Sequence, residues 1–366
     1  MDRTAETQGI YIDFKFVFYY YKITFIVRKE VYFMGATIRD VAKKTGLSLG
    51  TISKYINGQP VRESNRVLIE QAIAELQFKP NKIAKGLRNS QTFSVAVLLP
   101  MLTSNFCTSM ISTIESYLLP RGYSVIVCEC HNDTQMELQK TKFLLDRMVD
   151  GIILIPYDTS GRQIELIQKN QTPLVVVDQL IKNHPADTII LDNQTASYEP
   201  VLQLIQMNHK KIAIITGGED HYTSQERLAG YKKALTEYGL PICPAYIQCG
   251  EYTTVGGYEA MQRLAALPDP PTAVFISNYD MEIGAYLAIN SLNLQIPDDI
   301  SIIGFDNLPL VNLVKPSLSF CEQPTEEMGL SAATLLYQRM QNDLSDYPKT
   351  IVHAPIFHFT ASIRTI

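Results

Sequence analysis

The feature that most constrains the fold is a series of short apolar runs between Phe93 and Ile366. Runs rich in Val, Ile and Leu alternate there with segments of helical spacing. They read SVAVLLP, SVIVCEC, GIILIP, PLVVVD, TIILD, KIAIITG, AYIQCG, TAVFIS and ISIIGFD. Continuous apolar strands that alternate with helices predict parallel sheets covered on both faces. Because nine strands are many for one compact sheet, we predict two doubly wound α/β lobes that divide near Asp192 to Ala196.

Ligands of open α/β sheets bind outside the carboxyl ends of the strands. Several polar or aromatic residues follow the predicted strands and are the candidate ligand contacts: Phe106, Cys107, Asp178, Arg227, Tyr252, Asn278 and Asp306. Each also has a simpler interpretation, since the aspartates could cap helices, Arg227 could pair with Glu226, and the aromatic side chains could belong to the core. Arginine and aspartate together suit polar rings with neighbouring hydroxyls, which favours a sugar, sugar acid or sugar phosphate.

A second feature is the stretch TIRDVAKKTGLSLGTISKYIN at residues 37–57. Val41 belongs to a short amphipathic helix, Gly46 permits a tight turn, and Ser48 can cap a second helix. One face of the second helix packs on the first, whereas the other keeps Lys54 free for a polyanion. This pattern predicts a helix-turn-helix whose second helix enters the major groove of DNA. A helical hairpin within an unrelated core is the alternative.

The residues around this stretch have a different charge from the rest of the chain. Residues 34–92 hold ten Lys and Arg against four Asp and Glu, whereas residues 93–366 hold 17 against 29. Such a division is typical of a basic nucleic-acid-binding head on an acidic body. A third helix of the head is predicted from residue 64 to 76. Its expected inner face consists of Val67, Leu68, Ala72 and Leu76.

The stretches TIRDVAKKTGLSLGTISKYINGQPV and AIAELQFKPNKIAKGLR resemble the head of lactose-repressor-type (LacI/GalR family) transcription regulators. The resemblance implies that Leu49, Gly50 and Lys54 contact base edges. It implies phosphate contacts from hydroxyl and amide side chains, namely Thr37, Ser48, Thr51, Ser53 and Asn57. Leu87 matches the hinge leucine that enters the minor groove from each subunit of a dimer. Arg62 departs from the family's usual serine, which puts the cap of the third helix in doubt.

The resemblance also extends over the rest of the chain. It implies a body like that of periplasmic binding proteins, in which the chain crosses three times between the lobes, the third time near Gln323-Pro324. The expected domains are a head at 34–79, a hinge helix and linker at 80–92, and a body at 93–366, with lobe 1 at about 93–194 plus 324–340 and lobe 2 at about 195–323 plus 341–366. The seven candidate ligand contacts match the family's effector positions.

The implied protein is a homodimeric regulator, expected to be a repressor, that binds a pseudopalindromic operator in double-stranded DNA. A small carbohydrate-type effector between the lobes would change the spacing of the two hinges. Its expected place is the bacterial cytoplasm, at the nucleoid. Two alternatives stay open: a sugar receptor without a regulatory role, and an enzyme acting on a nucleotide sugar.

Residues 1–33 differ from the rest of the chain because they are crowded with Phe and Tyr, interrupted by Lys15 and Lys22. This stretch is short for a membrane span and lacks a small-residue cleavage site. A β-hairpin packed on the body is one interpretation. Our hypothesis is that Met34 is the native start and that residues 1–33 are a non-native leader.

Several functional classes find no support in the sequence. It has no G-x-G-x-x-G or P-loop phosphate motif, no G-x-S-x-G nucleophile motif and no H-E-x-x-H pair. The six cysteines lack a framework spacing, which predicts buried free thiols in a reducing compartment. No apolar stretch reaches the ~18 residues that cross a membrane. We therefore expect no catalysis, no cofactor, no metal site and no membrane partner.

Overall fold

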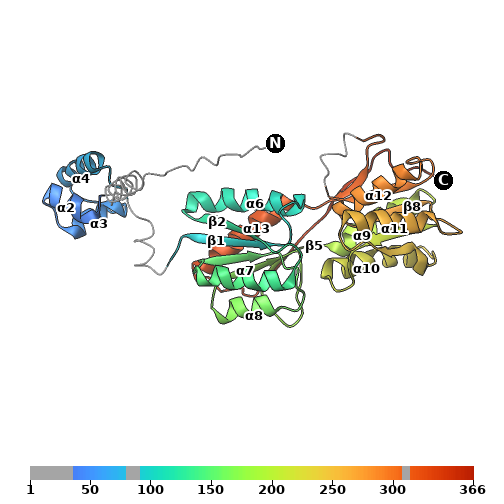
Figure 1. The fold of residues 1–366 in the computed structure, drawn as a ribbon, viewed down its shortest axis with the longest axis horizontal. Helices are drawn as coiled ribbons and strands as arrows, with labels where there is room; N and C mark the ends of the chain where they lie inside the picture. Colours follow the sequence, from blue (N-terminus) through green and yellow to red (C-terminus); the bar gives the residue numbers. More distant parts are fainter. Residues whose placement is uncertain (1–35, 80–90, 307–313) are drawn as a thin grey trace, which may run out of the picture. The chain divides into compact units, whose positions relative to one another are not determined.

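The computed structural model describes residues 36–79, 91–306 and 314–366. The chain divides into two compact units, residues 1–85 and residues 86–366 (Figure 1), which we call the head and the body. The proposed leader at 1–33 and the hinge leucine Leu87 lie outside the described residues. The hypotheses about both therefore stay predictions.

The described part of the head consists of three helices, α2 (Ile38–Thr45), α3 (Leu49–Ile56) and α4 (Glu63–Leu76). Thr37 and Asp40 form a capping box at the start of α2, in which each side chain bonds the backbone N–H of the other. Gly46 ends α2 with φ 68°, a left-handed conformation that glycine adopts without steric cost. Ser48 Oγ then accepts a hydrogen bond from Thr51 N at 3.2 Å and begins α3. The expected helix-turn-helix is present.

The small core of the head differs in one respect from the sequence prediction. The side chains of Val41, Ile52, Ile69 and Ala72 are buried together with Phe78. Val67 and Leu68, expected on the inner face of α4, are instead 44% and 46% exposed. Residues two positions apart in an α-helix point in directions that differ by about 200°. Burial of Ile69 therefore turns Val67 to nearly the opposite face. The prediction chose the wrong stripe because α4 is apolar on more than one side.

The first lobe of the body is built on a six-stranded sheet in the order β11-β5-β4-β3-β1-β2, in which all neighbours are parallel. Its strands are β1 (Ser94–Leu99), β2 (Ser124–Glu129), β3 (Gly151–Leu154), β4 (Leu174–Val177), β5 (Asp187–Leu191) and β11 (Thr350–His353). Its helices are α6 (Asn105–Leu118), α7 (Thr134–Asp146), α8 (Arg162–Lys169) and α13 (Thr325–Met340), with the 3₁₀ turn Leu119–Arg121. The helices α6 and α13 cover one face of the sheet, and α7 and α8 cover the other (Figure 1).

The second lobe has a six-stranded sheet in the order β12-β10-β9-β8-β6-β7. Its strands are β6 (Ile212–Thr216), β7 (Ile247–Cys249), β8 (Ala273–Ile276), β9 (Ser301–Phe305), β10 (Ser319–Glu322) and β12 (Ile356–His358). Its helices are α9 (Asn193–Gln206), α10 (Tyr222–Glu237), α11 (Thr254–Ala265) and α12 (Tyr279–Ser291), with the 3₁₀ turn Pro244–Tyr246. Only β12 runs antiparallel to its neighbour among the described strands of this sheet.

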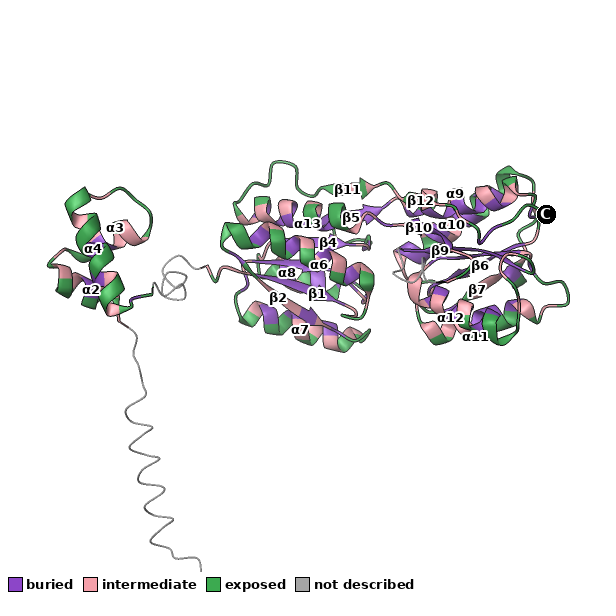
Figure 2. Cartoon of the chain, turned by 90° about the horizontal axis from the view of Figure 1, so that it is seen from above, coloured by how far each residue is buried: buried purple, intermediate pink, exposed green. Residues whose placement is uncertain are grey.

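All nine apolar runs of the sequence form strands, β1 to β9, and the predicted fold class is confirmed. Buried residues concentrate in both sheets, whereas exposed residues lie on the outer faces of the helices (Figure 2). This burial on two faces is the reason that the strands read as continuous apolar runs rather than alternating ones.

The connections between the lobes differ from the expected ones. The chain passes from β5 to α9, from β10 to α13, and from β11 to β12, so the passage at Gln323-Pro324 is the second of three. The third lies between His353 and Ile356. Assigning residues 341–353 to lobe 2 was wrong, because Thr350 to His353 pair with β5 in the first sheet. A four-residue edge strand leaves too weak a sequence pattern to show which sheet it joins.

Candidate functional site

The first candidate site is the outer face of α3. Ile52 is fully buried and fixes the inner face of this helix in the core of the head. Leu49 is 47% exposed, and Gly50 and Lys54 are exposed beside it. The three residues assigned to base contacts thus share an accessible helix face, which is the placement that groove reading requires. Their contacts with DNA stay a prediction.

The residues assigned to phosphate contacts are held in place by local hydrogen bonds. Thr37 Oγ1 and Ser48 Oγ cap α2 and α3, and the two hydroxyls of Ser48 and Thr51 lie 3.0 Å apart. Asn57 Nδ2 donates to Ser53 O at 2.8 Å. These bonds order the short polar side chains at the ends of α2 and α3. Ordered hydroxyl and amide groups of this kind suit contacts that fix a register on a phosphate backbone. The side chain of Arg62 makes no capping bond, so the cap of α4 is missing as the sequence suggested.

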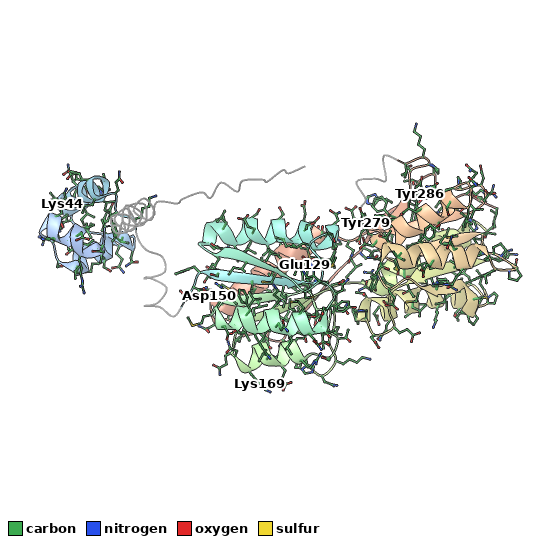
Figure 3. All side chains as sticks on the ribbon, viewed as in Figure 1. Lys44, Glu129, Asp150, Lys169, Tyr279 and Tyr286 are labelled. Carbon is green, nitrogen blue, oxygen red and sulfur yellow. The ribbon has the colours of Figure 1, made fainter. Side chains whose placement is uncertain are left out.

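The first described residues of the body are held by the side chain of Asp150, which directly precedes β3. Asp150 Oδ1 accepts a hydrogen bond from Thr92 N at 2.8 Å, and Asp150 Oδ2 accepts one from Phe93 N at 2.7 Å. At the other end of the sheet, Glu129 Oε1 accepts a bond from Leu102 N at 3.0 Å; Figure 3 labels both acids. The residues that follow the linker are therefore tied to the first lobe by its own sheet.

The second candidate site lies where strands of the two lobes end. Asp178 follows β4, Asp306 follows β9, and the guanidinium of Arg227 on α10 interacts electrostatically with both carboxylates. Both aspartates have positive φ, 69° and 72°, so the chain turns sharply at the end of each strand. The structure thus brings these three candidates together, and Tyr252 and Cys107 also interact electrostatically with members of this cluster. Neither the expected alternative of Arg227 pairing with Glu226 nor a cap by Asp178 is what the structure shows, because Arg227 bonds elsewhere and no helix starts after β4.

The electrostatics of this cluster follow from its burial. Burial raises the pKa of Asp178 to about 7; the cation of Arg227 opposes this and the charge of Asp306 adds to it. Burial likewise raises the pKa of Asp306 to about 6, against Arg227 and a hydrogen bond from Gln323 Nε2 at 2.8 Å. One guanidinium therefore offsets only part of the cost of two buried carboxylates.

Arg227 itself is 3% exposed and held on several sides. Its Nε donates to Asn193 Oδ1 at 2.8 Å, and its Nη1 donates to Ser277 O at 2.6 Å. The guanidinium carbon lies 3.9 Å from the ring centroid of Phe305. These contacts fix the plane of the guanidinium in a cation–π arrangement. They use two of the five N–H donors of the guanidinium.

The other candidates have more local roles. Asn278 caps α12, since its Oδ1 accepts from Met281 N at 3.2 Å. The hydroxyl of Tyr252 lies 2.8 Å from Thr223 Oγ1 and 2.6 Å from Ser224 Oγ, and its ring packs on the core of the second lobe. The core position of the Tyr252 ring agrees with its simpler interpretation, whereas Asn278 acts as a helix cap; the effector contacts of both stay predictions.

Phe106 and Cys107 lie at the start of α6 and have different surroundings. Phe106 is half-buried and lines a cleft of about 690 Å³. Cys107 is 3% exposed within the core of the first lobe, where burial raises the pKa of its thiol to about 12. Cys107 does not line this cleft but interacts electrostatically with Asp178 and Asp306, so its assignment as an effector contact stays a prediction.

The comparisons with known proteins give the family. Residues 37–81 match the model described as bacterial regulatory proteins, lacI family, and residues 201–357 match a periplasmic binding protein-like domain. Catabolite control protein A of Priestia megaterium is 32% identical over 324 residues, which cover 88% of this chain and 97% of that protein. The chain belongs to the LacI family. It is therefore a DNA-binding transcription regulator.

Further relatives agree with this membership. The HTH-type transcriptional repressor CytR of Escherichia coli K12 is 32% identical, over 84% of this chain and 90% of its own. The ribose operon repressor of the same strain is 33% identical, over 83% of this chain and 93% of its own. A lac repressor dimer bound to operator shares the fold, with a TM-score of 0.80 at 23% identity, covering 90% of this chain and 99% of that chain. Of the helices in the described ranges, none has the length and apolarity to span a membrane.

The structure of this LacI-family chain adds residues that the sequence analysis did not single out. Gln179 follows Asp178 and links the lobes, since its Oε1 accepts from Tyr222 N at 3.1 Å. Gln323 contacts Asp306, and Glu282 lies buried behind it with an electrostatic contact to the same carboxylate. Gln179 and Gln323 each stand within a residue or two of a strand end, a signal that was available. Glu282 lies within a helix, and its depth was not readable from spacing.

Proposed function

We propose that this protein is a sequence-specific DNA-binding repressor whose operator affinity is set by a small carbohydrate-type effector in the body. The DNA-binding part of this proposal rests on the exposure of the outer face of α3. Leu49, Gly50 and Lys54 stand exposed there on a helix whose opposite side is fixed by Ile52. This face belongs to the basic part of an otherwise acidic chain, and neutralising phosphates is the main source of affinity for DNA.

The effector half is supported by the polar cluster at the strand ends of the two lobes. Asp178, Arg227 and Asp306 come from different lobes yet interact, so a ligand between them contacts both lobes at once. A LacI family regulator from Enterococcus faecium with bound ribose has the same body fold, at 26% identity and a TM-score of 0.68. We therefore assign a sugar, sugar acid or sugar phosphate to this site.

The proposed coupling follows from the anchor at the start of the body. Effector binding shifts the balance between arrangements of the two lobes, which requires differential affinity worth typically about 1–3 kcal/mol. Because Asp150 ties Thr92 and Phe93 to the first sheet, a displacement of lobe 1 moves the end of the linker with it. In a homodimer, the spacing of the two linkers then changes. Leu87 is the residue we assign to the minor-groove contact.

The proposed function is tested by selecting binding sites for the full-length protein from bacterial genomic DNA. The selected operator should be bound much more tightly than bulk duplex, with affinity that falls steeply between about 50 and 200 mM salt. Lys54→Ala should weaken binding to the operator and relax the preference at one base position. The matched control is Lys232→Ala, which removes an exposed lysine from α10 of the body. A protein that shows no preference for any genomic site would refute the proposal.

The effector half is tested by thermal shift with a panel of sugars, sugar acids and sugar phosphates, since a ligand that binds only the folded state raises the melting temperature. Asp306→Asn should abolish the response to the effector found, while operator binding in its absence remains. Asp298→Asn, at an exposed site of the same lobe, is the control. An unchanged dose response in Asp306→Asn would remove this residue from the site.

A further inference from the structure

The cleft of about 690 Å³ has a one-sided charge. Four acids are among the described residues that line it, Asp306, Glu322, Glu326 and Glu327, and neither lysine nor arginine is among them. The remaining polar lining consists of hydroxyls and amides: Asn105, Ser109, Ser112, Thr113, Gln323 and Thr325. Phe106, Pro324 and Ile356 supply the apolar part.

The neighbours of these acids do not balance their charge. His358 Nε2 lies 2.6 Å from Glu322 Oε2, and His353 Nδ1 lies 3.8 Å from Glu327 Oε2. Arg227 faces Asp306 but shares its charge with Asp178, so that even with both imidazoles protonated these three cations face five acids. The N-terminus of α13 opens on the cleft, but a helix terminus contributes only about half a charge. The cleft therefore keeps a negative potential at neutral pH.

The arginine of the neighbouring cluster already faces two carboxylates. Arg227 donates to Asn193 and Ser277, and its charge faces both Asp178 and Asp306. An anionic group that entered beside it would be a third negative group around one guanidinium. Such a group would also lose its hydration on entry, a cost that burial makes large unless a counter-charge is supplied.

Unpartnered acceptors in the same region indicate what a ligand must bring. Gln323 is 5% exposed and lines the cleft; its Nε2 donates to Asp306, but its Oε1 has no partner among the described residues. In the neighbouring cluster, Asp178 Oδ1 is also buried with no hydrogen-bond partner in the described part of the chain. Buried acceptors that lack a donor are costly, so a ligand rich in O–H or N–H groups satisfies what the protein leaves open.

We propose that the effector site, formed by this cleft and the adjoining cluster of Asp178, Arg227 and Asp306, selects a hydroxyl-rich effector that is uncharged or carries an amine. Sugar acids and sugar phosphates are rejected. This inference rests on the proposed function, which it narrows to one part of the carbohydrate class. Its physical basis is the pairing of an acidic, acceptor-rich cleft with donor groups. Charged walls of low dielectric focus the potential within a cleft, which strengthens the discrimination against anions.

The charge of the cleft can be measured without knowing the effector. Ser109→Cys places a thiol in the cleft, in a full-length background with Cys243→Ser and Cys249→Ser, whose native thiols are the two that are not buried. The thiol is then reacted with a trimethylammonium and a sulfonate derivative of ethyl methanethiosulfonate. The ratio of the cationic to the anionic rate should exceed that of Gln262→Cys, on the exposed face of α11, by about fivefold or more.

Neutralising two acids of the cleft should remove this difference. With Glu326→Gln and Glu327→Gln added, the rate ratio at residue 109 should fall toward the control value. The matched control adds Glu165→Gln and Glu259→Gln, two exposed acids on α8 and α11, and should leave the ratio unchanged. A ratio at residue 109 that equals the control or favours the sulfonate reagent would overturn the proposal.

The second arm measures binding by thermal shift and calorimetry with matched probes: glucose, glucosamine, glucuronate and glucose 6-phosphate, then ribose and ribose 5-phosphate. Within each set we expect the anionic member to bind at least about tenfold more weakly than its parent. An acid or phosphate that binds more tightly than its parent would overturn the proposal. If no member of any set binds, the carbohydrate part of the proposed function is contradicted, while the rate ratios still decide whether the cleft rejects anions.

Discussion

The buried ion pair between Arg339 and Asp187 offers a sharp test of how the first lobe is held together. Arg339 lies near the end of α13, and Asp187 begins β5; their side chains are 2% and 0% exposed. Arg339 Nε donates to Asp187 Oδ2 at 2.7 Å, and Nη2 donates to Asp187 Oδ1 at 3.1 Å. Lys349 N also donates to Asp187 Oδ1, at 2.8 Å. The pair therefore joins the returning helix, the sheet and the segment before β11.

The magnitude follows from what each substitution leaves behind. Arg339→Met leaves a buried carboxylate whose remaining donor among the described residues is Lys349 N. Breaking a buried pair in this way costs about 3–5 kcal/mol of unfolding free energy. Asp187→Asn should cost about 2 kcal/mol, because Arg339 keeps the carboxylate of Asp346 and the carbonyl of Asp343. The double variant, Arg339→Met with Asp187→Asn, should lose less unfolding free energy than the two single variants added together. The difference should exceed about 1 kcal/mol, because the buried amide of the double variant carries no charge.

The assay is thermal and urea unfolding of the full-length variants, followed by circular dichroism. For a body of this size, a loss of about 4 kcal/mol lowers the melting temperature by about 10 °C. Lys169→Met, which removes an exposed partner of Glu165, is the control and should change stability by less than about 0.5 kcal/mol. Strict additivity of the two buried substitutions, or a loss below about 1 kcal/mol for Arg339→Met, would refute the reasoning.

Three further predictions concern other parts of the chain. Burial raises the pKa of Glu282 well above its ordinary value, so the folded state keeps a proton that the unfolded state loses above about pH 4.5, and stability should fall as the pH rises. Glu282→Gln should flatten the pH dependence of the melting temperature, and an unchanged slope would contradict this. Gly284→Ala should destabilise lobe 2 in urea unfolding by about 1–3 kcal/mol or more, because its Cβ would meet Thr254 O at 1.9 Å; a neutral effect would show that the α11–α12 contact yields. Leu87→Ala should weaken operator binding severely in gel shifts while effector affinity stays intact, whereas equal loss on random DNA would argue against a minor-groove role.

Much of the architecture was readable from local patterns. Capping residues and one glycine mark the helices of the head, because Thr37, Ser48 and Gly46 act through bonds to their own neighbours. The nine apolar runs all form strands, since burial on both faces leaves no room for polar alternation. Such signals survive in a single sequence because the groups that interact lie within a few residues of each other.

The candidate site was predictable only in part. Strand ends are identifiable in the sequence, so Asp178, Arg227 and Asp306 could be chosen, and the structure brings them together. The assignment of Cys107 to the effector site stays a prediction, because the thiol is buried in the core of the first lobe and yet interacts electrostatically with Asp178 and Asp306. The choice of Val67 for the inner face of α4 was wrong, because a shift of two positions along a helix moves a side chain to nearly the opposite face.

The sequence by itself determined the elements, their order and the polar residues that end the strands. Tertiary structure decided which partners those residues meet: Arg339 with Asp187, 152 positions apart, and β11 with the first sheet rather than the second. It also decided that the lining of the cleft is acidic, since its acids follow β9, end β10 and begin α13. Contacts between distant segments depend on how helices and sheets pack, and packing energies are not encoded in any local pattern of residues.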